Sequence, residues 1–171
     1  MVTAILFGLY SAAVGIAVNL ILYFAGLDKA PGAAWSGIIP FLASVLFLYL
    51  AMKQRKEEDF DGTITYGQCI GTGALVGVFS GIVMAIFMYL YYTSIDPSMV
   101  DEIVRKSEAA MRERNVPPDR MAQALSMTRS WAVPGTVLSM LFGSPAISTV
   151  LSLIIGLFVR TKPEEQAIKA V

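Results

Sequence analysis

The stretch GQCIGTGALVGVFSG, residues 67–81, contains five glycines and decides the class of the protein. Gly71, Gly73 and Gly77 come within one residue of the GxGxxG spacing of a dinucleotide-binding loop. Glycines also stand four residues apart here, the spacing that lets two transmembrane helices approach closely. The first interpretation predicts a soluble nucleotide-binding domain, and the second predicts a helix embedded in a membrane.

The surroundings of this stretch do not fit a nucleotide-binding loop. Such a loop follows a strand, begins a soluble helix and is accompanied by an acidic residue about 20 positions later. Here residues 63–65 are too few for a core strand, residues 78–92 (VFSGIVMAIFMYLYY) are apolar on every face, and the next acidic residue is Asp96. Close packing of helices in a membrane therefore explains the glycines better.

The rest of the chain also indicates a membrane protein. Hydrophobic residues make up 56% of it and charged residues 15%, whereas an ordinary soluble domain is about 25% charged. Four segments without Asp, Glu, Lys or Arg are longer than the roughly 18 residues that mark a membrane span. We therefore expect an all-α integral membrane bundle of four transmembrane helices, forming a single domain of residues 1–171. The expected spans are about 3–26, 33–52, 65–95 and 133–159.

The first apolar run is expected to remain in the protein as a span. It has no Lys or Arg before it, and it is longer than the roughly 7–15 apolar residues of a cleaved signal peptide.

Basic residues beside the span ends predict the orientation. Those at 53–56 and 160–169 favour both termini in the cytoplasm, against Lys29 alone in the first loop. The arginines of residues 97–130 oppose this orientation, but acidic residues nearly balance them.

Residues 65–95 are expected to form the longest helix. Thr65 and Gln68 have the spacing of a capping box, which places the start of the helix near Tyr66. A helix from there to Ile95 is about 45 Å long and exceeds a hydrocarbon core of about 30 Å. It must therefore tilt or project from the membrane.

Residues 97–130, between spans three and four, are expected to form an amphipathic helical segment outside the membrane core. Asp96 and Pro97 suit the first positions of a new helix. An apolar face at helical spacing is formed by Val100, Ile103, Val104 and Met111. This face lies on the membrane surface, docks a protein partner or covers the end of the bundle, and the sequence leaves these possibilities open.

Span four contains two prolines, Pro134 and Pro145. Because proline lacks an amide donor and crowds the preceding turn, Pro145 is expected either to kink the helix or to divide it near residues 143–144. The sequence does not distinguish these outcomes.

Small and weakly polar residues recur four apart in three of the spans, and we expect them to form the helix contacts. The candidates are Gly67, Gly71, Gly73, Gly77 and Gly81 in the third span, Ser11, Gly15 and Asn19 in the first, and Ser144, Ser148, Ser152 and Gly156 in the fourth. The alternative is that these rows line a path for solutes. Asn19 is expected to bond to a neighbouring helix rather than to a substrate.

The sequence lacks the residues that most catalytic and metal chemistry needs. It contains no histidine, its single cysteine, Cys69, lies within a span, and none of the four apolar runs contains an ionisable residue. The acids at 57–61 could bind a metal, but beside the basic residues at 53–56 they are more typical of a solvated loop. We therefore expect no enzymatic activity, no cofactor and no metal site. Balanced acids and bases argue against a nucleic-acid partner, and proton-coupled transport lacks its usual buried ionisable group.

Three features together resemble the family named domain of unknown function 4199. They are DGTITYGQCIGTG (61–73), the glycine-bearing third span, and YTSIDP (92–97) directly after it. The similarity covers nearly the whole chain. The resemblance implies a small four-span protein in the inner membrane of a Bacteroidetes-type bacterium, and it implies no catalytic or binding residue.

These observations predict a non-enzymatic accessory, assembly or structural subunit of an inner-membrane complex. Its expected partners are membrane lipid and either another protein or further copies of the same chain. The alternative is an oligomeric channel or transporter, in which the glycine and serine faces line a path for ions or small solutes.

Overall fold

The computed structural model describes residues 1–27 and 37–161, which form helices and connecting turns and contain no strand. The helices are α1 (Val2–Phe24), α2 (Ile38–Glu58), α3 (Tyr66–Leu90), η2 (Tyr91–Ile95), α4 (Ser98–Glu113), α5 (Pro118–Leu138), η3 (Ser139–Gly143) and α6 (Ser144–Val159). Four stretches are long and apolar enough to cross a membrane: α1, α2, Tyr66–Ile95 and Pro118–Val159. The predicted all-α class with four candidate membrane spans is thus confirmed.

The third span begins and ends where the sequence predicts. The Thr65 hydroxyl accepts a hydrogen bond from the Gln68 amide, and the Gln68 side chain accepts one from the Thr65 amide, so the capping box is present. Before it, Asp61 and Gly62 turn the chain with φ angles of 47° and 77°, a region that glycine adopts without strain. At the other end the π-helical turn η2 extends the helical run to Ile95.

The second span continues further than expected. The predicted start at residue 33 lies outside the described residues. α2 continues past the predicted end at Met52 to Glu58. The basic residues at 53–56 therefore belong to the helix.

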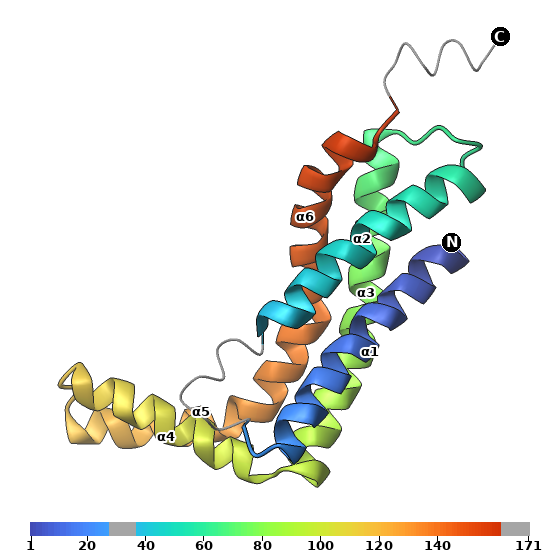
Figure 1. Cartoon of the computed structure of the whole chain (residues 1–171). Coiled ribbons are helices and arrows are strands. Elements are labelled where there is room, and N and C mark those ends of the chain that lie inside the picture. The colour runs from blue at the N-terminus through green and yellow to red at the C-terminus, as the bar shows by residue number, and fades with distance from the viewer. Residues whose placement is uncertain (28–36, 162–171) are drawn as a thin grey trace.

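The chain after Pro117 forms one continuous helical run, so the amphipathic segment predicted to end at residue 130 and the span predicted to begin at residue 133 are joined. Pro134 lies inside α5, and Pro145 follows the π-helical turn η3. The wider π turn lets a helix pass a proline that has no amide donor. Pro145 therefore does not divide the span. Figure 1 shows α5 leaving the bundle beside α4, while α6 runs along α3.

α3 is the central helix of the bundle and packs against α1, α2 and α6 (Figure 1). Residues from the four spans and from the α2–α3 turn form a common core: Ala4, Leu48, Ala51, Met52, Ile64, Cys69, Val76 and Val159. The outer faces carry large exposed side chains such as Phe24, Ile86 and Phe158. Such faces suit lipid, whose tails are as apolar as these side chains.

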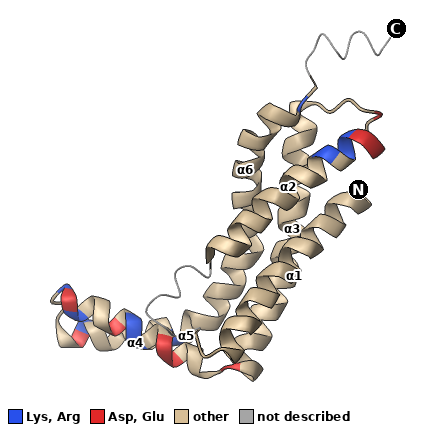
Figure 2. Ribbon diagram, viewed as in Figure 1, with Lys and Arg blue, Asp and Glu red and all other residues tan. Residues whose placement is uncertain are grey.

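Charged residues gather at the two ends of the bundle (Figure 2). One group lies around the α2–α3 turn, near the N-terminus, and the other lies in α4 and the start of α5. The helices between them show no charge in this view. This distribution is that of a multi-pass membrane protein whose ends reach the polar regions on either side.

The closest helix contact joins α3 to α6. A Cβ atom built on Gly73, Gly77 or Gly81 would come within 2.7 Å of heavy atoms of η3 or α6. The atoms met include Pro145 Cα and Met140 O, which belong to the backbone and cannot turn aside as a side chain can. Any side chain at these glycines would therefore force the two helices apart.

The α6 side of this contact consists of the small residues that the sequence singles out. Ser148 and Ser152 are buried, and Ser144 Cβ would lie 3.1 Å from a Cβ on Gly81. A Cβ on Gly156 would lie 3.0 Å from Cys69 Cβ. The row on α6 thus faces the row on α3 within one chain.

The opposite side of α3 meets α1 through a row that shares only Gly15 with the predicted one. Ala4, Gly8, Ala12 and Gly15 are buried, and a Cβ atom on Gly8 would lie 2.9 Å from the Val76 carbonyl oxygen. The first three stand four apart, so the spacing rule that selected the other rows also applies to them.

The remaining predicted packing residues of α1 have other neighbours. Ser11 Oγ donates a hydrogen bond to Ser44 Oγ of α2 at 3.4 Å. Asn19 Nδ2 donates to the carbonyl oxygen of Gly15, in its own helix, at 2.9 Å. Among the described residues Asn19 thus bonds within its own helix, and its expected bond to a neighbouring helix stays a prediction.

Two of the predicted packing glycines, Gly67 and Gly71, meet no neighbour. A Cβ atom on either would have no heavy atom of the described residues within 4 Å. They lie on the side of α3 that neither α1 nor α6 covers, so their four-residue spacing does not form a contact within the chain.

Replacing Gly77 with leucine is expected to lower the melting temperature strongly or to prevent folding, because overpacking a close contact costs about 1–3 kcal/mol or more. Gly71→Leu is the matched control, since it makes the same change on the same helix at an exposed position. The measurement is thermal unfolding in mild detergent, followed by circular dichroism. Equal melting temperatures of the two variants would contradict the close α3–α6 contact.

Candidate functional site

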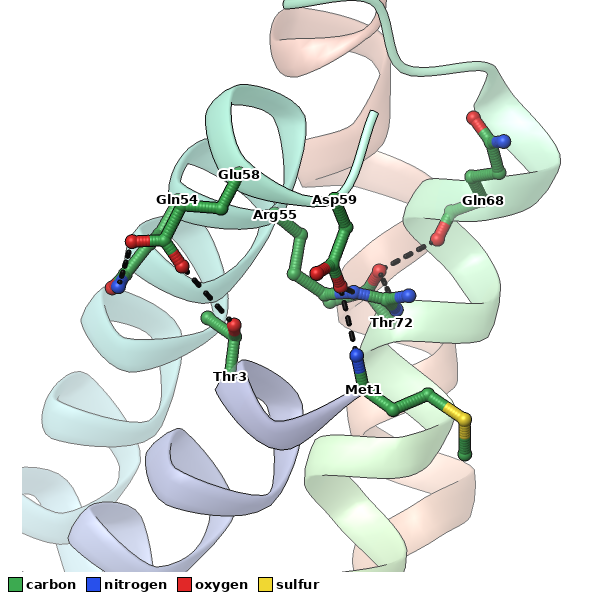
Figure 3. Close-up of polar contacts among 8 residues, drawn as sticks. All are labelled: Met1, Thr3, Gln54, Arg55, Glu58, Asp59, Gln68 and Thr72. Carbon is green, nitrogen blue, oxygen red and sulfur yellow. Dashed lines mark hydrogen bonds and ion pairs between the residues drawn. The ribbon is translucent and has the colours of Figure 1, made fainter. Parts of the chain in front are cut away.

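Arg55 is a buried cation near the end of α2, only 8% exposed. Its Nη1 group donates a hydrogen bond to Thr72 Oγ1 of α3 at 2.8 Å, and its Nε group donates to Asp59 Oδ2 at 2.8 Å (Figure 3). The guanidinium carbon lies 5.0 Å from the centre of the Phe60 ring, within the range of a cation–π contact. Arg55 therefore joins α2 and the turn after it to α3.

Asp59 links this cluster to the start of α1. The Met1 amine donates to Asp59 Oδ2 at 2.9 Å, the oxygen that also accepts from Arg55 (Figure 3). The Met1 ammonium and then the Arg55 guanidinium lower the pKa of the Asp59 carboxyl below its usual value of 3.8. The stability that this carboxylate contributes is therefore present above pH 3.8, and it is lost as the pH falls through the lower pKa of the folded protein.

The burial of Arg55 differs from the sequence prediction, which places residues 53–56 at the membrane edge. The helical spacing of the buried residues in α2 would have predicted that Arg55 is buried. Leu48, Ala51 and Met52 are buried, and Arg55 follows the last two of them by four and three residues, on the same face. The charge composition suggested a solvated segment, whereas the periodicity continues the buried face to Arg55.

Two of the acidic residues at 57–61, Glu58 and Asp59, take part in contacts between helices. Glu58 accepts hydrogen bonds from Gln54 at 2.7 Å and from Thr3 of α1 at 3.4 Å (Figure 3). Within residues 1–27 and 37–161, no three His, Cys, Asp or Glu residues lie close enough to hold a metal ion. The arrangement at this end of the bundle serves to fasten helices together.

The end of α6 is fastened at the same place. Lys56 Nζ donates to the Val159 carbonyl oxygen at 3.3 Å, and the Ile64 amide donates to Thr161 Oγ1 at 2.9 Å. The Thr161 amide in turn donates to the Ile64 carbonyl oxygen at 2.9 Å. All four spans therefore meet at the α2–α3 turn.

At the opposite end, α4 packs along α5 to form a hairpin that projects to the side of the bundle (Figure 1). The Ser98 amide donates to Asp96 Oδ1 at 3.1 Å. Pro97 occupies the N-cap position of α4, so the helix begins one residue later than the sequence predicts. The predicted apolar face is half-buried at each of its positions: Val100, Ile103, Val104 and Met111. Because α5 is the main neighbour of α4, part of this face is already covered by the chain itself.

The outside of the α4–α5 hairpin is charged. Glu102 pairs with Arg105 at 2.6 Å and with Lys106 at 3.5 Å, and Arg129 of α5 pairs with Asp101 of α4. The hydrogen bond from Arg105 is the main cause of a lowered pKa of the Glu102 carboxyl, and the charges of Arg105 and Lys106 add to it. The pairs of Glu102 lie within α4, and the pair between Arg129 and Asp101 joins the two helices.

Two large apolar side chains of α5 remain uncovered near this hairpin. Met127 is 65% exposed and Trp131 is 56% exposed. Neither was among the residues predicted as a partner face, although both lie in the predicted amphipathic segment or directly after it. They are the exposed apolar anchors that α5 offers to a membrane surface or a partner.

A cavity of about 320 Å³ lies between α1, α2, α3 and the start of α6. Its polar lining consists of serine hydroxyls: Ser11, Ser44, Ser80, Ser144 and Ser148. No ionisable side chain lines it among the described residues. Ser11, Ser144 and Ser148 belong to the predicted rows, whereas Ser44 and Ser80 are brought to the cavity by the arrangement of the helices. The chemistry available here is hydrogen bonding to an uncharged group.

The sequence model of the family described as "Protein of unknown function (DUF4199)" matches residues 6–161. The match runs from the first turns of α1 to the end of α6 and so includes the bundle and the α4–α5 hairpin. No curated protein matches the chain, and no solved structure matches it.

Replacing Arg55 with methionine is expected to lower the melting temperature, because it leaves the buried Thr72 hydroxyl without its guanidinium partner. Losing such a partner costs about 1–3 kcal/mol. Lys53→Met is the matched control on the same helix, where the side chain is exposed. The measurement is thermal unfolding in detergent, and a loss no larger than that of the control would show that Arg55 does not hold the helices.

Replacing Glu102 with glutamine tests the ion pairs of the hairpin through their pH dependence. The folded pKa is lowered, so the carboxylate stabilises the protein above the unfolded pKa of 4.5, and this contribution is lost as the pH falls through the folded pKa. The melting temperature of the unmodified protein should exceed that of the variant at pH 7, and the gap should close below pH 4.5. Glu113→Gln, at an exposed position, should show no such pH-dependent gap. A Glu102→Gln gap that is the same at every pH would contradict the assignment.

Proposed function

The chain belongs to the DUF4199 family of proteins of unknown function, a membership that assigns no activity, and we propose that it is a non-enzymatic accessory subunit of a membrane protein complex. Its four candidate membrane helices make it a multi-pass membrane protein. The proposed role is to bind another membrane protein through the α4–α5 hairpin and the exposed apolar residues beside it.

The observation that carries this proposal is a folded hairpin that projects away from the bundle (Figure 1). Its inner face is covered by its own two helices, and the ion pair between Arg129 and Asp101 joins them. The bundle is fastened at its opposite end and along α3, so it does not depend on this hairpin for closure. A preformed module with Met127 and Trp131 exposed has the features of a binding surface, in which aromatic and methionine side chains are enriched.

The polar groups that join the helices favour binding over catalysis. Arg55, Asp59 and Thr72 are engaged in contacts between helices, and none of them faces the serine-lined cavity. A catalytic group would instead be expected in a pocket, with a perturbed pKa and room for a substrate.

We retain the oligomeric channel only as the alternative. The glycine and serine rows that would line a path face each other inside a single chain. The serine-lined cavity favours the alternative, but Ala4, Leu48 and Val76 are at most 1% exposed and fill the core of the bundle. A path would therefore have to form between copies of the chain.

We also propose an inner-membrane location with both termini in the cytoplasm. Support comes from Lys53 and Lys56 in the last turns of α2 and from Arg160 directly after α6, at the bundle end where Lys56 bonds to Val159. Figure 2 shows basic residues gathered at this end, near the N-terminus. Basic residues close to span ends favour the cytoplasmic side. In the hairpin at the other end, several arginines are paired with acids. The hairpin would then meet its partner on the side away from the cytoplasm.

Placing a photoreactive amino acid at Met127 or Trp131 tests the proposed surface in native membranes. We expect a discrete crosslinked product with another protein from these positions. The control is the same amino acid at Ile86, which is 59% exposed on a membrane span and should meet lipid. Products of equal yield at all three positions, or none at the hairpin, would contradict the proposal. Crosslinking of the chain only to itself would favour the oligomeric alternative.

A further inference from the structure

We propose that the serine-lined cavity binds the carbonyl group of an uncharged, membrane-soluble molecule. This site is separate from the α4–α5 hairpin, and it does not depend on the accessory role. Its volume of about 320 Å³ exceeds that of several water molecules. The argument rests on which serine hydroxyls already have a hydrogen-bond acceptor and which do not.

Hydroxyl groups in membrane helices usually donate to a carbonyl oxygen of their own helix. On α6, Thr149 donates to Pro145 O at 2.7 Å and Ser152 donates to Ser148 O at 2.6 Å. The hydroxyls of Ser144 and Ser148, which line the cavity, donate to no group of the described residues. Thr149 and Ser152 thus have acceptors in their own helix, whereas Ser144 and Ser148 do not. This difference is expected if the hydroxyls of Ser144 and Ser148 bind a ligand.

The lack of an acceptor matters most at Ser148, because this residue is only 5% exposed. Its hydroxyl oxygen is not among the fully buried polar atoms that lack a partner, so it is accessible from the cavity. A hydroxyl in such an enclosed place usually meets a partner or an ordered molecule. Ser44, on the α2 side, accepts from Ser11 at 3.4 Å and has no acceptor of its own among the described residues. The cavity thus presents hydroxyl donors from two sides, and its ligand must supply acceptors.

The walls of the cavity restrict the ligand further. Its lining includes the apolar side chains of Phe41, Met84, Met140 and Ile147. Since none of the described lining residues is ionisable, they offer no counter-charge to a charged ligand. Phe41 and Ile147 are also exposed on the outer surface of spans, so the cavity is reached from the side that faces lipid. An uncharged molecule with carbonyl acceptors on an apolar body fits these conditions.

Two sources supply this chemistry within a membrane: the ester carbonyls of a glycerolipid and the ring carbonyls of a quinone. The closed core beyond the cavity favours binding over passage. Ala12 and Gly15 keep the α1 wall free of long side chains, which leaves room for a flat ring or for an ester group. The structure does not require the ligand to react.

The test is a titration of the full, delipidated chain in detergent, with bound ligand counted by native mass spectrometry. The two probes are dioctanoylglycerol and a decyl-substituted benzoquinone. We expect one of them to form a saturable complex of one ligand per chain. The combined Ser144→Ala and Ser148→Ala variant should bind about fivefold more weakly or worse, the loss expected for hydrogen bonds made only to the ligand.

Two further variants keep the result interpretable. Ser44→Leu fills the cavity from α2 and should abolish binding without touching α6. Thr149→Val is the matched control, because its hydroxyl bonds to its own helix outside the cavity, and it should bind as the unmodified chain does. Circular dichroism confirms that each variant is folded. The proposal is overturned if neither probe saturates at one per chain, or if the serine variants and Ser44→Leu bind as tightly as the control.

Discussion

The close approach of α3 and α6 determines the rest of the structure. Gly73, Gly77 and Gly81 have no side chains to separate the helices, so the backbone of α3 lies against α6. In a membrane the hydrophobic effect does not drive helices together, and association relies on close packing and on hydrogen bonds. Gly8 of α1 repeats the arrangement on the other side of α3, which makes α3 the central helix. The Arg55 cluster then fastens the ends of the helices at one side of the membrane.

Length, composition and local signals were enough to predict the elements of the fold. The four candidate spans and the capping box at Thr65 and Gln68 depend on neighbouring residues and were read from them. Neighbouring residues alone do not determine which row of small residues forms a helix contact. Gly67 and Gly71 have the same spacing as Gly73 and Gly77, but they face away from every described helix. Only the position of the partner helix decides which row is used.

The candidate sites were less predictable, because each combines residues from several helices. Burial of Arg55 depends on Thr72 of α3, and the sequence provides only the periodicity that continues from Met52. The apolar face of α4 was predicted correctly as a face, but its neighbour, α5, could not be inferred from the pattern. The serine-lined cavity requires four helices to converge. The single-helix rows predicted Ser144 and Ser148, but they could not show that these hydroxyls would lack an acceptor.

The most direct test of the central contact uses the native Cys69 and one added thiol. A Cβ atom on Gly156 would lie 3.0 Å from Cys69 Cβ, close to the roughly 3.5–4.5 Å that a disulfide spans. The account predicts that mild oxidation of a Gly156→Cys variant in membranes joins both thiols within one chain, which protects both from a maleimide label while the chain remains monomeric. Phe158→Cys, on the outer face of α6, should leave both thiols reactive once the protein is unfolded. Unprotected thiols in the Gly156→Cys variant, or disulfides formed only between chains, would contradict the packing of α6 on the glycine row of α3.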